Sequence, residues 1–252
     1  MAKKAAPPDT SPARVRESLK LLERADRRNG GPAAAFEATV ELAFCAVAKS
    51  CAGNPEKAEA YEARYMKEVG RWDKATVSEV FVPIFSYALT SPGIDFWGTM
   101  AGESNVLSAH LGQFFTPFEV CRLMAEISMG DIAETLRKSP RPFLTVHEPA
   151  SGSGAMILAA AATVEARGYD LGTTMWVDTM DLSPLAFKMC YLSLSAAGIA
   201  GVVRHGNSLS REQFDACLTP AAGRFLSVHG NPFDRPKSYG APPPRLRTRG
   251  TR

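Results

Sequence analysis

The sequence predicts a parallel α/β sheet preceded by a region made only of helices. From Leu144 onward, apolar segments typical of strands alternate with helical ones, as when LTVHEP is followed by AMILAAAATVEARG. The preceding part shows helical periodicity and helix-capping signals instead. A chain of 252 residues, 45% apolar and 22% charged, is large enough to bury a core of this kind.

Four helices are expected before the sheet. Ser11-Pro12 would begin the first, ARVRESLKLLERADRR, and Gly30-Gly31 would end it. The second is PAAAFEATVELAFCAVAKSC, which is apolar enough to be buried. The third, EKAEAYEARYMKEVGRW, follows Asn54-Pro55. The fourth, TVSEVFVPIFSYALTS, contains Pro83, which is expected to interrupt it before it ends near Pro92-Gly93.

Four strands are expected in the α/β part, over LTVHEP, MWVDTMD, GVVRH and RFLSVHG. A helix opened by Ser183-Pro184 and closed by Gly198 separates the second and third, and a short helical piece separates the third and fourth. Ligands of parallel sheets bind beyond the carboxyl ends of the strands. Four polar residues follow these apolar segments and become site candidates: Glu148, Asp181, Asn207 and Asn231.

Charge and cysteine usage bear on nucleic-acid binding, metal binding and disulfide formation. The net charge of +3 does not by itself indicate nucleic-acid binding, but residues 235–252 hold six Lys/Arg and no acid among Pro and Gly. This tail is expected to be disordered, or to act as a phosphate-binding arm. The five cysteines are scattered and form no CxxC pair, so neither a metal site nor a disulfide framework is expected.

Targeting signals are not recognisable in the chain. The N-terminus MAKKAAPPDTSP lacks an apolar signal core, and no run of about 18 apolar residues is seen. We therefore expect no membrane association and a cytoplasmic location.

The segment HEPASGSGAM, residues 147–156, carries the strongest functional signal. It joins a strand to a helix through a glycine-rich turn, residues 150–154. Such a turn binds nucleotide-like cofactors at a helix N-terminus, where glycine lets the backbone approach the ligand or take positive φ. Because turns between strands and helices often contain Gly and Ser without any ligand, the turn alone leaves both interpretations open.

A second signal lies in GQFFTPFEVCRLMAEI, residues 112–127. Thr116 is expected to cap a helix, with Pro117 in its first turn and Glu119 completing a capping box. A well-capped helix is the simpler interpretation. It leaves Phe114 and Phe115 unexplained, and two aromatic rings beside a helix N-terminus could line the pocket of an amphiphilic cofactor.

GQFFTP, EPASGSG and the acidic residue of MDLSP, in this order and spacing, resemble the N6-adenine DNA methyltransferases. The likeness covers residues 95–233 and is strongest to the modification subunits of restriction–modification systems and their phage and plasmid relatives. It implies a Rossmann-like, S-adenosylmethionine-dependent core whose sheet is incomplete, because the family continues with further strands. The expected division is a disordered segment 1–11, a helical domain 12–111, a cofactor-binding domain 112–233 and a basic tail 234–252.

The resemblance assigns cofactor contacts to individual residues. The FTP motif would contact the methionine part, the glycine turn would lie beneath the cofactor, and Asp181 would accept hydrogen bonds from the ribose, with Asp178 as the alternative. Asn207 would lie near the adenine ring, although it could equally be a turn residue before Ser208. The complete set is Phe115, Thr116, Pro117, Glu148, Pro149, Gly152, Gly154, Asp181 and Asn207.

The catalytic motif departs from the family pattern. The family carries Asn or Asp, two prolines and an aromatic residue that stacks on an extruded base. This chain has Asn231, Pro232 and Phe233, one proline short. The expected function is methyl transfer to adenine in DNA. The alternative is a weak or inactive module that binds cofactor, DNA or a partner, such as a specificity subunit or a second copy. A dinucleotide-dependent oxidoreductase is disfavoured, since the turn lacks G-x-G-x-x-G.

Overall fold

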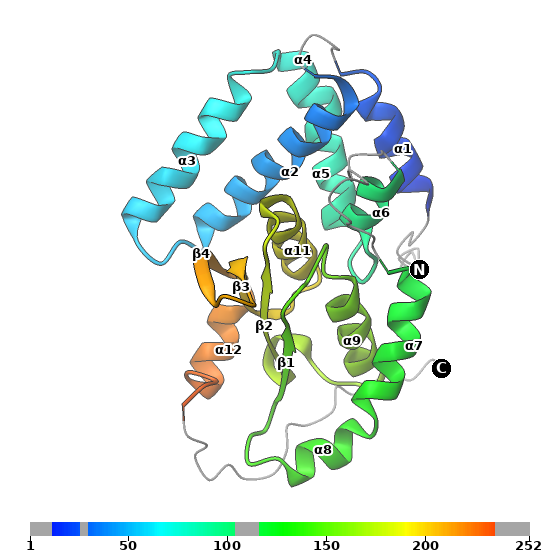
Figure 1. Ribbon diagram of the computed structural model, residues 1–252, viewed down its shortest axis with the longest axis vertical. Helices are drawn as coiled ribbons and strands as arrows, with labels where there is room; N and C mark the ends of the chain where they lie inside the picture. The colour runs from blue at the N-terminus through cyan, green and yellow to red at the C-terminus, as the bar shows by residue number, and fades with distance from the viewer. Residues whose placement is uncertain (1–11, 26–29, 104–115, 235–252) are drawn as a thin grey trace, which may run out of the picture.

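The computed structural model describes residues 12–25, 30–103 and 116–234. Within them, helices lie against a four-stranded sheet, and the first six helices and a π-helical turn gather beyond one end of it (Figure 1). The helices of this first part are α1 (Pro12–Leu22), α2 (Gly31–Ser50), α3 (Pro55–Val69), α4 (Lys74–Thr76), η2 (Val77–Phe81), α5 (Val82–Leu89) and α6 (Phe96–Glu103). The remaining elements are α7 (Phe118–Met129), α8 (Ile132–Lys138), β1 (Leu144–Glu148), α9 (Ala155–Ala166), α10 (Leu171–Thr174), β2 (Met175–Asp181), α11 (Pro184–Ala196), β3 (Ala200–Asn207), β4 (Glu212–Leu218) and α12 (Ala222–His229).

The sheet has the order β1-β2-β3-β4. The first three strands are parallel and are joined through α9 and α11, whereas β4 returns antiparallel beside β3. Successive residues of a strand face opposite sides. Val177 and Val203 accordingly belong to the core shared with α9 and α11, and Trp176 and Val202 to a smaller cluster with Phe225 of α12. This βαβαβ arrangement is a Rossmann-like α/β core.

One hydrophobic core connects the helical part to the sheet layer. It extends from α1 and α2 through α9 and α11 to β3. Phe44 of α2 is fully buried, and its ring meets those of Tyr61, Phe187 and Tyr191 edge-on, at centroid distances of 5.6, 5.3 and 5.3 Å. Edge-to-face pairs contribute beyond the burial of apolar area. The two parts therefore stabilise each other.

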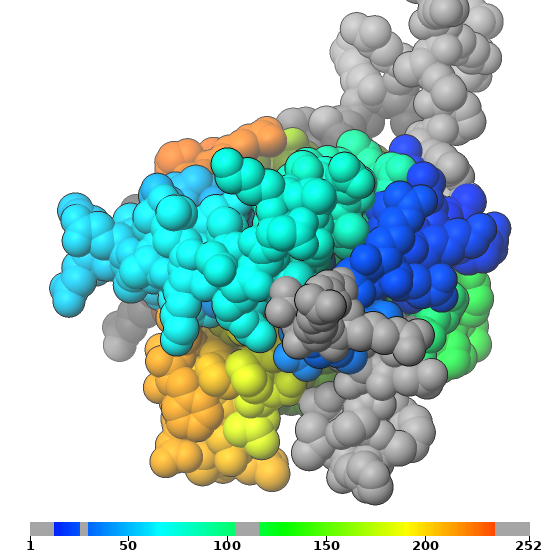
Figure 2. All heavy atoms as spheres, turned by 90° about the horizontal axis from the view of Figure 1, so that it is seen from above, coloured from blue at the N-terminus to red at the C-terminus, as the bar shows by residue number. Residues whose placement is uncertain are grey.

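Polar contacts tie α3 to the edge strand β4. Lys57 forms an ion pair with Asp215 at 2.8 Å and also donates to the carbonyl of Ala216. The hydroxyl of Tyr61 lies 2.9 Å from the Cys217 sulfur. Seen from above, the helices coloured blue to cyan form most of the surface, with the orange β4 beside them (Figure 2).

The helix signals of the first part are confirmed in most places. Asn54 caps α3, accepting from the Lys57 amide at 2.8 Å, and Pro55 occupies its first turn. The expectation that Pro83 interrupts the fourth helix is wrong, because helical structure continues from Lys74 to Leu89. The π-helical turn η2 ends at Phe81, two residues before the proline. Such a turn widens the backbone spiral and accommodates the missing N–H.

Two predictions at the end of the α/β part are wrong, and they are wrong together. The piece expected to be helical is the strand β4, and RFLSVHG, expected to be a strand, belongs to the helix α12. Ala222 and Phe225 are fully buried, with Leu226 packed beside them. This i, i+3, i+4 spacing is that of one helix face, which the sequence interpretation overlooked.

The helix α2 has the length and apolarity of a membrane-spanning segment. Of its most apolar stretch, 61% is buried inside the protein, as in the core helix of a globular protein. The predicted segment 1–11, the boundary at 111/112 and the tail beyond Asp234 lie outside the described residues.

Candidate cofactor site at the ends of β1 and β2

The glycine turn follows β1 as expected. Gly152 and Gly154 have φ values of +55° and +96°, a region that residues other than glycine rarely adopt. The backbone therefore requires glycine at both positions.

The two residues before the turn are placed differently. Glu148 ends β1 half-buried and accepts from the amide of Ala150 at 3.1 Å, while Pro149 is exposed.

Packing adds a second requirement at Gly154. A Cβ there would lie 3.1 Å from Leu194 Cδ1 and 3.3 Å from Cys190 Sγ, both on α11. Gly154 thus allows the start of α9 to approach α11 closely. Besides the positive φ that the sequence interpretation allowed for, Gly154 thus has a role in helix packing that the interpretation did not consider.

Asp181 is held against the glycine turn. Its Oδ2 accepts from the amide of Gly152 and its Oδ1 from the amide of Ser183, both at 2.8 Å. The carboxylate is half-buried at the end of β2. Because a carboxylate offers about four acceptor positions, two backbone bonds leave it able to accept from further hydroxyls.

The alternative acid, Asp178, is committed elsewhere. It forms a two-pronged ion pair with Arg204 of β3, at 2.7 Å to Nε and 3.0 Å to Nη2. Its side chain lies on the opposite face from that of neighbouring Thr179, as the strand period requires. The geometry therefore favours Asp181 as the acid of the site.

The structure adds Asp95, which the sequence interpretation did not identify. This aspartate precedes α6 and is buried; Ser153 donates to its Oδ2 at 2.8 Å, and the Gly98 amide to its Oδ1 at 3.0 Å. A Cβ at Gly98 would collide with both Asp95 and Ser153. Burial raises the pKa of Asp95, although its two donors partly oppose that shift. An Asp that caps the amide three residues on is a recognisable sequence signal.

The start of α7 lies beside the start of α9. Phe118 and Cys121 share an apolar cluster with Ala155, the first residue of α9. The expected capping box is wrong: the helix begins at Phe118, and Pro117 occupies the capping position without a side-chain bond. Thr116 and Pro117 are exposed, and Phe115 lies outside the described residues.

Asn207 ends β3 and shapes the turn that follows. Its Oδ1 accepts from the amides of Leu209 and Ser210, at 3.0 and 3.2 Å. The interpretation of Asn207 as a turn residue is thus confirmed. A contact with an adenine ring stays a prediction.

The structure separates Asn231, Pro232 and Phe233 from these residues. They follow α12 rather than a strand, and Asn231 bonds within its own turn, to the Phe233 amide and Asp234. Phe233 is exposed and Pro232 is buried. The expectation that this motif ends a parallel strand is therefore wrong.

Contacts of α12 place the motif near the start of the strands. His229 lies 2.8 Å from the carbonyl of Thr173, just before β2, and packs on Phe143, just before β1. The glycine turn lies at the other end of the same strands. Since β2 has seven residues, the two ends are on the order of 20 Å apart.

A known protein family matches the second part of the chain. Residues 99–237, more than half of the chain, match the family described as N-6 DNA Methylase. A similar solved structure is the type I restriction-modification system methyltransferase subunit from Streptococcus thermophilus, with 13% identity and a TM-score of 0.37. The match covers 74% of this chain and 55% of that one. No curated protein matches. On the extent of the family match, the chain belongs to the N-6 DNA methylase family.

Proposed function

We propose that the chain binds S-adenosylmethionine at the carboxyl ends of β1 and β2. The observation that carries the proposal is the bond between Asp181 and the Gly152 amide, which joins the acid to the glycine turn. In the proposed complex, Asp181 accepts from the ribose hydroxyls and Asn207 lies near the adenine. Thr116 and Pro117 approach the methionine part from the start of α7, with Phe115 before them, and Glu148, Pro149, Gly152 and Gly154 form the floor.

We propose methyl transfer to the N6 of adenine in DNA as the reaction that this site serves. Family membership supports it. The bound cofactor would supply an electrophilic methyl group, so the protein's task is to align that group with the acceptor nitrogen. The chain spans about half the length of the methyltransferase subunit that it matches. DNA, a specificity subunit or a second copy are its proposed partners, and the cytoplasm its proposed compartment.

A second candidate function is a module that binds the cofactor, DNA or a partner without efficient turnover. The position of Asn231 favours it. Reacting groups must approach to about 3–3.5 Å, which a motif at the far end of the strands does not satisfy. The shortened motif, with one proline, favours the same candidate.

Two measurements test these functions separately. Calorimetric titration of S-adenosylmethionine tests cofactor binding, which Asp181→Ala is expected to weaken. Incorporation of labelled methyl groups into unmethylated DNA then distinguishes an enzyme from a binding module. Absence of S-adenosylmethionine binding would contradict the proposed cofactor site. Binding of the cofactor without methyl incorporation would favour the binding module.

A further inference from the structure

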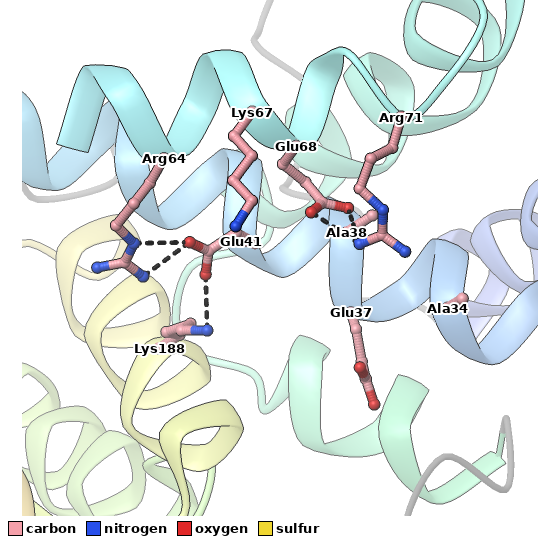
Figure 3. A pocket seen from close by; sticks show the side chains of 9 residues that line it. All are labelled: Ala34, Glu37, Ala38, Glu41, Arg64, Lys67, Glu68, Arg71 and Lys188. Carbon is pink, nitrogen blue, oxygen red and sulfur yellow. Dashed lines mark hydrogen bonds and ion pairs between the residues drawn. The ribbon is translucent and has the colours of Figure 1, made fainter. Parts of the chain in front are cut away.

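A polar cavity of about 580 Å³ lies where α2, α3 and α11 meet (Figure 3). Its lining, within the described part of the chain, includes none of the candidate cofactor residues. Four positions of α2 and four of α3 or its end repeat the spacing i, i+3, i+4, i+7, so each segment presents one face to the cavity. Lys188 of α11 completes the lining, whose members are Ala34, Glu37, Ala38, Glu41, Arg64, Lys67, Glu68, Arg71 and Lys188.

Two of the three carboxylates are already occupied by protein donors. Glu41 pairs with Arg64 at 2.7 Å and with Lys188 at 2.6 Å. Burial would raise the pKa of Glu41, but these two cations outweigh it and lower that pKa, so the carboxylate stays charged. Glu68 accepts from Arg71 and from the indole of Trp72 at 3.1 Å.

The cations keep donors that the carboxylates do not use. Lys67 makes no ion pair with any described residue, and Figure 3 shows its ammonium group directed into the cavity. The third carboxylate, Glu37, also lines the cavity but points away from Lys67. Lys188 has three donors and uses one on Glu41. Arg64 bonds Glu41 through Nε and Nη2. Its guanidinium also lies 5.5 Å from the ring centroid of Phe44, which helps to fix its orientation.

We propose that this cavity binds a small ligand that carries a phosphate group, such as a nucleotide, at a site separate from the glycine turn. Guanidinium and ammonium groups are the donors that proteins use for phosphate. The volume lies within the range of small-molecule sites. Three helices line the cavity, and its volume is that of a small-molecule site, so we propose a small ligand rather than a nucleic-acid backbone as the occupant.

The ligand would bridge the helical part and the sheet layer. Arg64 and Lys67 belong to α3, whereas Lys188 belongs to α11, whose first turn follows Asp181. A phosphate held between them would add an attraction across this junction. Binding should therefore raise the melting temperature of the whole protein, as any ligand specific for the folded state does.

The test adds ADP, ATP or inorganic phosphate to the protein of 252 residues. Calorimetry measures binding, and thermal unfolding measures the melting temperature. ADP is expected to bind, and more weakly as salt rises. Lys67→Glu is expected to lower the affinity for ADP at least tenfold, because a positively charged donor is replaced by a carboxylate with the same negative charge as the phosphate. Lys67 is exposed, so this variant should fold. Lys20→Glu on α1, also exposed, makes the same charge change outside the cavity and should leave the affinity unchanged.

Four outcomes would overturn the proposal. They are absence of binding for all three probes, equal ADP affinity in the wild type and Lys67→Glu, displacement of ADP by S-adenosylmethionine, and loss of duplex-DNA binding in Lys67→Glu when no nucleotide binds. The third would place the nucleotide in the glycine-turn site. The fourth would identify the occupant as the DNA backbone. Circular dichroism of each variant confirms that the fold is intact.

Discussion

Ser153 donates a 2.8 Å hydrogen bond to Asp95, a residue 58 positions earlier in the chain. This bond joins the residue before α6 to the middle of the glycine turn. Both side chains are buried, and the second oxygen of Asp95 is satisfied by the Gly98 amide. The turn is therefore fixed from one side by Asp95 and from the other by Asp181.

Asp95 should make stability depend on pH. Its pKa is raised in the folded state by burial, so its contribution is complete below the pKa of the unfolded chain and is lost as pH rises through the folded value. Asp95→Asn does not titrate there. We expect this variant to gain stability relative to the wild type as pH rises above the unfolded value of about 4, as measured by urea unfolding.

Asp73→Asn provides a control with the opposite sign. Asp73 caps α4, and its bonds with Thr76 lower its pKa. Its contribution is therefore present above the unfolded pKa and is lost as pH falls. A difference between wild type and Asp95→Asn that stays constant over this pH range would contradict the assignment of Asp95.

Gly154→Ala and Gly223→Ala should change stability in opposite directions. At Gly154 the positive φ costs about 1–2 kcal/mol for an L-residue, and the new Cβ would press on Leu194 and Cys190. At Gly223, inside α12, a Cβ meets nothing within 4 Å, so alanine should stabilise the helix by up to about 1 kcal/mol. Denaturant midpoints measure both, and a stabilised Gly154→Ala would disprove the packing argument.

Asp181→Ala should reduce the affinity for S-adenosylmethionine about ten- to a hundredfold, the effect of losing a charged hydrogen-bond partner. Asp178→Ala is the matched control. It breaks the ion pair with Arg204 and should lower the melting temperature while leaving affinity nearly unchanged. Calorimetry measures the cofactor affinity of each variant. A larger loss of affinity in Asp178→Ala than in Asp181→Ala would mean that the wrong acid has been chosen.

Any DNA methylation by this chain should be weak and should survive Asn231→Ala. The reason is the position of Asn231 near the start of β1 and β2, on the order of 20 Å from the glycine turn. The assay measures methyl incorporation into unmethylated genomic DNA, with Asp181→Ala as the variant expected to lose it. Loss of robust activity in Asn231→Ala would instead show that the motif reaches the cofactor.

Local signals with a direct physical cause allowed much of the fold to be predicted. Asn54-Pro55 and Ser183-Pro184 begin helices where they should, because each supplies a capping oxygen and a favourable proline. The resemblance to the methyltransferase family indicated Asp181, with Asp178 as the alternative, and the strand period places these two side chains on opposite faces. These features depend on neighbours within a few residues.

Predictions failed where distant residues decide. The segment RFLSVHG lies in a helix whose i, i+3, i+4 spacing was overlooked, and the packing of Phe225 against Phe143 and Trp176 favours that helix over the expected strand. The role of Asp95 depends on Ser153, which no local pattern connects to it. Asn231 was misplaced because the preceding segment was misassigned, so one error in secondary structure moved a whole motif to the wrong end of the sheet.

The aromatic cluster around Phe44 has a consequence for how the molecule denatures. Since Phe44, Phe187 and Tyr191 interlock across the junction, the helical part cannot melt without exposing α11. Heating should therefore produce a single calorimetric peak whose van't Hoff enthalpy equals the enthalpy measured directly. Phe44→Ala leaves a void shared by both parts. We expect it to lower the temperature of that single peak by several degrees, without splitting the peak in two.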